Sequence, residues 1–430
     1  MSQAQRGSSK MNISDFPAKE RMDKVSRSPV SVWAALAAAP VGSPTRRRLK
    51  PPLHRLLAAA LAAGSLLGLP GGPRTGPLPS PSIARAEAGN DKPVPPKVQA
   101  AVDKALDWLA KNQNPDGTWP AGQGISTSVP SLAVMAFLAS GHTPGQGPYG
   151  ESINKAIDYV LSQQKSDGLL SANNGNAGMY EHGISTAMLA ESCSLVDDAR
   201  KARIEKAVAL GAKLILDAQK PRGKPKSMPH TGGWRYSQRS EDSDISVTGW
   251  QLEALRGASR CGAPIPNDAL EAGREFVRRC AVPKELGGGF TYQAGNRDAN
   301  APRTGTGVLA LELTGDHHNS PEALRGGDYL LDHPLTNPRQ GFYFYGIYYV
   351  SRAYKQLGGE YWETGYPKLR DALLSAQNDQ GVWPDGSGQE MRAGDAYRTS
   401  MAVLALCVPS QQATPSTMPA QTRRSTEHEK

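Results

Sequence analysis

Two aspartates, Asp242 and Asp244, are separated by a single residue and lie just before an apolar helical run. Neighbouring carboxyl groups can share a proton, which raises the pKa of one of them and lets it serve as a proton donor. Asp244 is also followed by Ser246 and Thr248, a pattern typical of a helix N-cap and its first turn. The sequence therefore leaves two roles open for Asp244, which are a catalytic acid assisted by Asp242 and a helix cap.

Aromatic and ionisable side chains gather at the beginnings of several predicted helices. Tyrosine and tryptophan rings can stabilise a carbocation or stack on a sugar ring, so both ligand classes remain open. His182 also fits a helix cap, and Trp250 also fits the hydrophobic core. The candidate substrate-binding residues are Tyr180, His182, Trp250, Tyr292, Tyr343, Tyr345, Tyr397 and Arg398.

Metal and cofactor chemistry find little support in the sequence. His317, His318 and His333 have no spaced acidic partner of the kind that completes a metal site. The glycines at 287–289 lack the strand and helix context of a phosphate-binding loop. We predict no metal and no cofactor.

The four cysteines form no C-x-x-C pair and no zinc-ligand spacing with histidine. Cys193 and Cys407 fall inside apolar helical runs, where a thiol usually behaves as a small buried hydrophobic group. We therefore expect no disulfide framework.

A repeated unit positions these residues. From residue 97 onward an amphipathic helix, a polar turn with glycine and an aromatic residue, and a second helix rich in small residues recur six times. The predicted first helices cover residues 101–113, 156–164, 212–219, 272–280, 327–332 and 369–377. The predicted second helices cover residues 127–140, 182–195, 246–259, 304–313, 345–357 and 397–408.

Six helix pairs without strand-like alternation predict a single all-α domain over residues 97–408. Closure into an α6/α6 toroid, with the small-residue helices as an inner ring, leaves few exposed ends, whereas an open solenoid is the alternative. In a closed toroid the loops that enter the inner helices meet at one mouth. The candidate residues lie in or just after those loops.

The net charge of +9 is concentrated at the front of the chain. Residues 1–86 carry 13 Lys or Arg against 3 Asp or Glu, so the remaining residues are close to neutral. Nucleic-acid binding needs a concentrated basic face on the folded domain, and we therefore predict no nucleic-acid partner.

The first 86 residues have the order of an export signal, with basic residues at 46–50, an apolar run over 56–69 and a small-x-small site at 84–86. The apolar run is shorter than the ~20 residues that a membrane-spanning helix needs. A twin-arginine type of signal and an uncleaved basic tail are alternatives. We predict an exported protein, periplasmic or secreted, in which residues 1–86 are extension and signal.

Two further segments complete the predicted organisation of the chain. Residues 87–96 are predicted to be a linker between the signal and the repeats. Residues 409–430, rich in Gln, Thr, Ser and Pro, are predicted to be a disordered tail.

The turns at residues 113–119 (QNPDGTW) and 377–383 (QNDQGVW) resemble the QW repeat of squalene-hopene cyclases, oxidosqualene cyclases and related prenyltransferase barrels. In such a turn Gln can bond exposed backbone at a helix end, Gly makes the bend and Trp clamps neighbouring helices. The resemblance covers residues 97–408 and implies the α/α-toroid fold.

The resemblance also bears on chemistry. Squalene cyclases protonate an alkene or epoxide with a D-x-D-D motif, and Asp242-Ser-Asp244-Ile245 places Asp244 at the position of the acid, whereas Ile245 replaces the last carboxylate. The cyclases have two barrels, but this chain has residues for one. Zinc-dependent protein prenyltransferases have one barrel, yet residues 303–308 supply none of their Cys or His ligands, so the resemblance implies no zinc prenyl transfer.

Three functions follow as hypotheses. The first is an apolar or isoprenoid-like ligand in a central cavity, with acid-initiated cyclisation by Asp244; the expected partners are an apolar small molecule or lipid and a membrane surface. The second is a carbohydrate-active lyase or hydrolase that uses His182, Tyr345 or Arg398. The third is a non-catalytic interaction scaffold, which a mouth filled by its own side chains would favour.

Overall fold

The computed structural model describes residues 94–120, 126–172, 178–220, 226–315 and 320–410. The predicted signal, most of the predicted linker and tail, and the histidines at 317 and 318 lie outside these residues. Within them every regular secondary-structure element is a helix, and there is no strand. No helix in the described ranges has the length and apolar character needed to cross a membrane.

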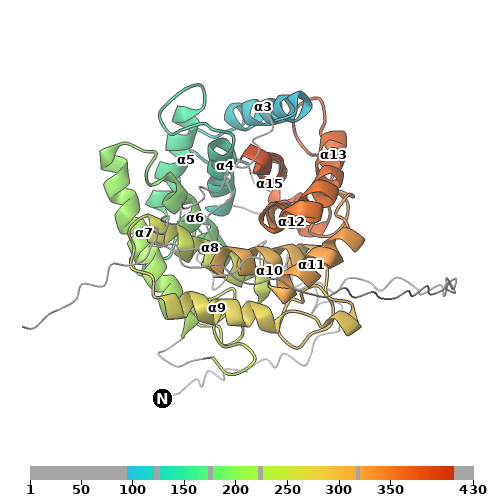
Figure 1. Ribbon diagram of the computed structural model, residues 1–430. Helices are drawn as coiled ribbons and strands as arrows, with labels where there is room; N and C mark the ends of the chain where they lie inside the picture. Colours follow the sequence, from blue (N-terminus) through green and yellow to red (C-terminus); the bar gives the residue numbers. More distant parts are fainter. Residues whose placement is uncertain (1–93, 121–125, 173–177, 221–225, 316–319, 411–430) are drawn as a thin grey trace, which may run out of the picture. The chain divides into compact units, whose positions relative to one another are not determined.

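Two sets of helices alternate along the chain (Figure 1). One set is α3 (Pro96–Lys111), α5 (Gly150–Ser162), α7 (Asp198–Gln219), α9 (Asn267–Arg279), α11 (Pro321–Asp332) and α13 (Tyr366–Ala376). The other set is α4 (Ser128–Ala139), α6 (Met179–Ser192), α8 (Ile245–Arg260), α10 (Ala301–Thr314), α12 (Tyr343–Leu357) and α15 (Asp395–Leu406). Shorter elements are η3 (Lys284–Leu286), η4 (Tyr361–Gly365), α14 (Gly388–Ala393) and η5 (Val408–Ser410).

The second set forms a closed inner ring. Each of these helices packs against the next in chain order, and α15 packs against α4 (Figure 1). The first set lies outside, where each helix packs against at least one inner helix, such as α5 against α4 and α9 against α10 (Figure 1). Inner helices are buried almost all round, as in α10, whereas outer helices such as α9 bury one apolar face. The prediction of a closed toroid is confirmed, and the open solenoid is wrong.

The polar turns join one repeat to the next. In the third repeat, Gln219 Nε2 donates to the carbonyl oxygens of Gly232 (2.8 Å), in its own turn, and Ala269 (2.9 Å), on the following outer helix. Trp234 Nε1 donates to Ile215 O at 2.7 Å and holds the turn on its own helix. The role predicted for Gln is confirmed, and the same Gln bonds recur at Gln113, Gln164 and Gln377.

Gln377 makes the junction that closes the outer ring. Its Nε2 donates to Ala101 O at 2.8 Å, so the last turn bonds the first outer helix as each of the first three turns bonds the outer helix that follows it. Helix α3 accordingly packs against both α13 and α15. The seam between the end and the start of the ring is therefore built like an internal junction.

Side chains of α8 and α12 meet across the interior of the ring, although α10 lies between these helices. The rings of Trp250 and Tyr348 stack with centroids 5.2 Å apart. Further along the same helices Arg352 Nη1 lies 2.5 Å from Glu253 Oε2, and Tyr348 donates to the same oxygen at 3.1 Å. Trp250 is fully buried, so its core interpretation is confirmed, and this part of the interior is filled by side chains.

A disulfide joins two neighbouring inner helices, contrary to the expectation of unpaired thiols. Cys193 is the C-cap of α6 and Cys261 is the C-cap of α8, with Cα atoms 6.0 Å apart. Cys193 does follow an apolar run, but the packing of α6 on α8 brings both helix ends together. Cys280 and Cys407 are buried free thiols, as expected for Cys407.

Candidate functional site

A cluster of polar and aromatic residues lies where chain segments enter the inner helices α6 and α8. Its members come from three successive repeats, because Tyr180 begins α6 and Tyr292 follows the fourth turn. We call it the mouth cluster. Its members are Tyr180, Arg235, Tyr236, Asp244 and Tyr292.

Asp244 caps α8 with one carboxylate oxygen. Oδ1 accepts the backbone N–H groups of Ser246 and Val247, both at 2.9 Å, which confirms the cap interpretation. Oδ2 is buried and takes no part in this cap. Its cationic neighbour is Arg235, whose Nη1 lies 3.8 Å away. Capping therefore uses only half of the carboxyl group.

The surroundings of Asp244 favour its neutral form. The residue is fully buried, and this burial raises the pKa of the carboxyl group from 3.8 to about 6, against the opposing influence of Arg235, the Tyr292 side chain and the two backbone N–H groups. A carboxyl group with such a pKa is able to give up a proton near neutral pH.

Three tyrosines surround this carboxyl group. The hydroxyl groups of Tyr236 and Tyr292 are hydrogen-bonded to each other, and the rings of Tyr180 and Tyr236 stack with centroids 6.0 Å apart. Arg235 lies over the rings of Tyr236 (4.6 Å) and Tyr292 (5.3 Å). Burial raises the pKa of Tyr236 to about 12, so its hydroxyl keeps its proton. The cluster presents aromatic faces, which attract positive charge.

Asp242 lies at the outer side of the cluster. Its Oδ2 is 3.2 Å from Arg235 Nε, and 43% of its side chain is exposed. The guanidinium group of Arg235 therefore links Asp242 with Asp244. Lys226, which donates to the backbone oxygens of Gly233 and Asp242, fixes the loop between them, and burial lowers its pKa to about 8.

Tyr345 forms the inner side of the site. Its hydroxyl is 2.8 Å from Thr306 Oγ1, and the side chain of Ser246 interacts with the hydroxyl groups of both Tyr345 and Tyr180. Tyr180 and Tyr345 are almost completely buried. The structure thus brings together five of the predicted residues, Asp242, Asp244, Tyr180, Tyr292 and Tyr345.

No family model matches the sequence. One segment of 73 residues is 33% identical to lanosterol synthase erg7A of Aspergillus fumigatus, and the match covers 17% of this chain but only 9% of that protein. The α-1,6-mannanase GH76A from Salegentibacter sp. has the same fold, with a TM-score of 0.53 at 11% identity over 73% of this chain and 99% of that chain. The chain has an α/α-toroid fold.

This likeness is one of fold and of one short segment. The type II terpene cyclase MstE from Scytonema aligns over 72% of this chain and 98% of the MstE chain, at a TM-score of 0.46 and 14% identity. The chain spans about a tenth of the length of the curated relatives that it matches.

His182 and Arg398 occupy the scaffold of the toroid. Leu170 N donates to His182 Nδ1 at 3.0 Å, just as the backbone N–H groups of Trp234 and Phe290 donate to Thr248 and Thr304 in the next two repeats. His182 Nε2 lies 3.1 Å from Gly211 O on α7. Both ring nitrogens are therefore used, and burial lowers the pKa of this imidazole to about 4. His182 lies within α6 and is not its cap, so that interpretation is wrong.

Arg398 has the same position on the last inner helix. Its guanidinium group donates to the carbonyl oxygens of Trp383 (2.8 Å) and Glu390 (3.0 Å) and pairs with Asp395. Like His182, which bonds Leu170, it bonds the backbone of the residue that ends the turn of its own repeat, here Trp383. We conclude that these bonds hold the turns on the inner ring.

Tyr343 and Tyr397 lie around a second buried carboxyl group that the sequence did not single out. Glu390 Oε1 accepts the N–H of Tyr345 at 2.9 Å at the start of α12, whose N-cap residue Phe342 makes no side-chain cap. The Tyr397 side chain interacts with the Glu390 carboxyl, whose pKa burial raises to about 7. Tyr343 is fully buried beside it.

Sequence reasoning missed Arg235, Tyr236 and Lys226. A signal for Tyr236 was present, because it lies two residues after the turn aromatic Trp234, as Tyr292 lies two residues after Phe290. The equivalence is also structural, since Met179 N donates to Tyr236 O and Ile245 N donates to Tyr292 O, both at 3.0 Å.

Changing Asp244 to Asn should alter the pH dependence of folding. Between about pH 6 and pH 4 the folded wild type takes up a proton that the unfolded chain, with its ordinary aspartate pKa, does not. Wild type therefore gains stability over Asp244→Asn as the pH falls through this window, by up to about 3 kcal/mol. Urea unfolding of both proteins across the window measures this gain. A difference that stays constant with pH would contradict a raised pKa.

Proposed function

We propose that the mouth cluster binds an apolar, isoprenoid-like ligand and that Asp244 protonates a carbon–carbon double bond in it. The observation that carries the proposal is the buried Oδ2 of Asp244, which takes no part in capping α8 and lies among Tyr180, Tyr236 and Tyr292. A carboxyl group in this state is suited to proton donation because capping consumes only its other oxygen.

In the proposed reaction the ligand gains one proton and later loses one, so its composition does not change. The proton of the Asp244 carboxyl group adds to one alkene carbon, and the cation formed at the other carbon is attacked by a second double bond of the same molecule. Loss of a proton from the cyclised cation then yields an isomer of the ligand. Arg235 stabilises the carboxylate that Asp244 becomes, and the tyrosine ring faces stabilise the cation.

We also propose that the protein is exported and acts at a membrane surface. The basic and apolar order of the first 86 residues supports export of the chain. An apolar ligand would be drawn from a lipid surface, so contact with a membrane surface is part of the same proposal.

The full chain, incubated with squalene and with geranylgeraniol, is expected to form cyclic isomers detectable by gas chromatography and mass spectrometry. Asp244→Asn should lower the rate by more than about a hundredfold, because asparagine still caps α8 but has no acidic proton. Asp197→Asn is the matched control, since Asp197 caps α7 in the same way at the surface. Unchanged turnover by Asp244→Asn would exclude this mechanism.

A second candidate rests on the pair of carboxyl groups joined by Arg235. Glycoside hydrolysis needs one carboxylic acid with a raised pKa and one carboxylate, and Asp244 and the half-exposed Asp242 meet that description. Release of reducing sugar from a panel of polysaccharides tests it. Asp242→Asn should abolish hydrolysis but leave cyclisation intact, which separates the two candidates; a chain inactive in both assays would favour an interaction scaffold.

A further inference from the structure

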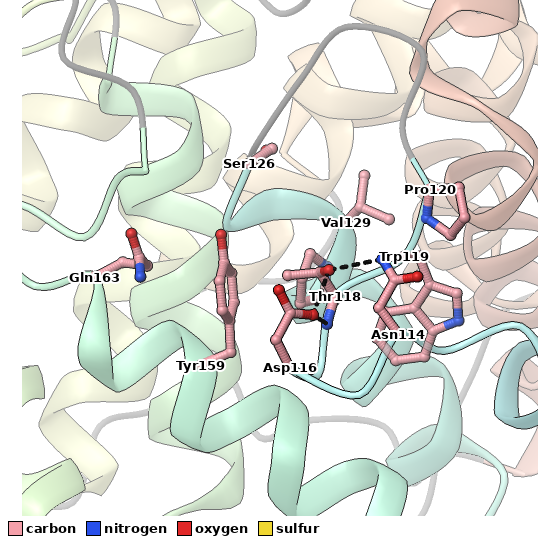
Figure 2. Close-up of a pocket in the computed structure, with 10 residues that line it drawn as sticks. Asn114, Asp116, Thr118, Trp119, Pro120, Ser126, Val129, Tyr159 and Gln163 are labelled. Carbon is pink, nitrogen blue, oxygen red and sulfur yellow. Dashed lines mark hydrogen bonds between the residues drawn. The ribbon is translucent and has the colours of Figure 1, made fainter.

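A cavity of about 330 Å³ lies at the first turn, outside the mouth cluster. We call it the turn cavity. It is enclosed by the turn after α3, the start of α4 and the end of α5 (Figure 2). Its volume is within the usual range of small-molecule sites. The polar residues that line it are Asn114, Asp116, Thr118, Ser126, Tyr159 and Gln163.

These side chains offer hydrogen-bonding groups toward a ligand. Thr118 donates from both its N–H (3.0 Å) and its hydroxyl (2.6 Å) to Asp116 Oδ1, so the second oxygen of this exposed carboxylate remains for a ligand. The Tyr159 hydroxyl is buried and has no hydrogen-bond partner among the described residues. Figure 2 shows its ring on α5, standing across from the turn that carries Asp116 and Thr118.

The equivalent place in the second repeat is occupied by the chain itself. Asp167 matches Asp116 in the turn, but its Oδ2 accepts a hydrogen bond from Gln238 at 3.2 Å. Leu214 matches Tyr159, because each lies five residues before the turn glutamine of its own helix. The fold therefore does not require a tyrosine or a free carboxylate oxygen at these two positions. The first repeat has both of these features, and the second repeat has neither.

The lining narrows the class of ligand. None of the lining residues is Lys, Arg or His, so a phosphate or carboxylate would find no opposite charge. The described residues contain no group of three His, Cys, Asp or Glu that could hold a metal ion. A purely apolar ligand would desolvate the carboxylate, amides and hydroxyls without replacing their hydrogen bonds.

We propose that the turn cavity binds a neutral sugar ring, which packs against Tyr159 and hydrogen-bonds through its hydroxyl groups to Asp116 and Gln163. A sugar ring combines apolar C–H faces with a rim of donors and acceptors, which matches the Tyr159 and Trp119 rings beside amide, hydroxyl and carboxylate groups. This site is separate from Asp244 and does not depend on the function proposed for the mouth cluster.

Saturation-transfer NMR and titration of the full chain with methyl mannoside, methyl glucoside, methyl galactoside and N-acetylglucosamine test the proposal. At least one of these sugars is expected to bind. Asp116→Asn should weaken that binding about tenfold, because the turn is retained and only the charged acceptor is lost. Tyr159→Ala should weaken it by at least as much, and Tyr159→Phe by less, since the ring remains.

Matched controls locate the binding. Asp167→Asn changes the equivalent carboxylate of the second repeat and should leave sugar affinity unchanged. Thermal melting of each variant shows whether it is folded. Gln163→Ala should also weaken sugar binding, and because Gln163 is half-exposed this variant tests the site independently of Asp116→Asn. The proposal is overturned if none of the four sugars binds, or if Asp116→Asn and Gln163→Ala bind as tightly as wild type.

Discussion

Gly232→Ala should destabilise the fold by about 4 kcal/mol or more, in the range that marks a specific structural conflict. Gly232 has φ +87°, and a Cβ atom there would lie 2.1 Å from Ala272 O on the following outer helix. This contact is with backbone, so relief requires the turn to move away from α9. The same movement would break the bonds that Gln219 makes to Gly232 and Ala269. Urea unfolding followed by circular dichroism measures the loss.

Gly262→Ala is the matched control for this prediction. Gly262 has nearly the same φ, +92°, but an added Cβ atom meets no atom within 4 Å. Its substitution should cost only the strain of a left-handed alanine, about 1–2 kcal/mol. Equal effects at the two positions would show that backbone conformation alone, and not the close approach of neighbouring repeats, requires glycine at the turn.

Arg352→Met should cost about 3–5 kcal/mol, because it removes the guanidinium group that pairs with Glu253 inside the ring. The two side chains are mostly buried, and Tyr348 also donates to Glu253. Methionine keeps much of the apolar stem of arginine, so the loss reports the missing charge rather than a cavity. Urea unfolding at neutral pH provides the free energy.

Two further variants isolate the charge effect. The double variant Glu253→Gln, Arg352→Met should recover part of the lost stability, because no ionised group is then left without a partner. Lys213→Met breaks the exposed pair with Asp217 and should cost less than about 1 kcal/mol. A loss at Arg352 no larger than the loss at Lys213 would contradict the importance of the pair that crosses the ring.

The sequence predicted the helices well because each repeat has its own periodic pattern and its own turn. The main difference in extent is α7, predicted over 212–219 but observed over Asp198–Gln219. Its first half is highly charged and lacks a continuous apolar stripe, yet Asp197 caps it by accepting Arg200 N–H. Local capping and the packing of α7 on α6 extend the helix beyond its apolar pattern.

The candidate site was predicted less completely. Asp244 and Tyr292 could be found because the loops before inner helices must meet at one mouth. His182 was a polar residue at the right place in sequence, but its use as an acceptor for the turn N–H became visible only beside Thr248 and Thr304. Cross-ring pairs such as Trp250 with Tyr348 depend on which inner helices face one another, and sequence spacing does not contain that information.

The seam at Gln377 has a kinetic consequence. Its bond to Ala101 joins residues 276 positions apart, whereas the equivalent bond of Gln219 joins residues 50 apart. Earlier junctions can form as soon as two successive repeats exist, but the last one must bring together distant parts of the chain and bear the largest loop-closure entropy. Helix α3 therefore lacks its contacts with α13 and α15 until the sixth repeat has been synthesised, and we expect ring closure to be a late step of folding.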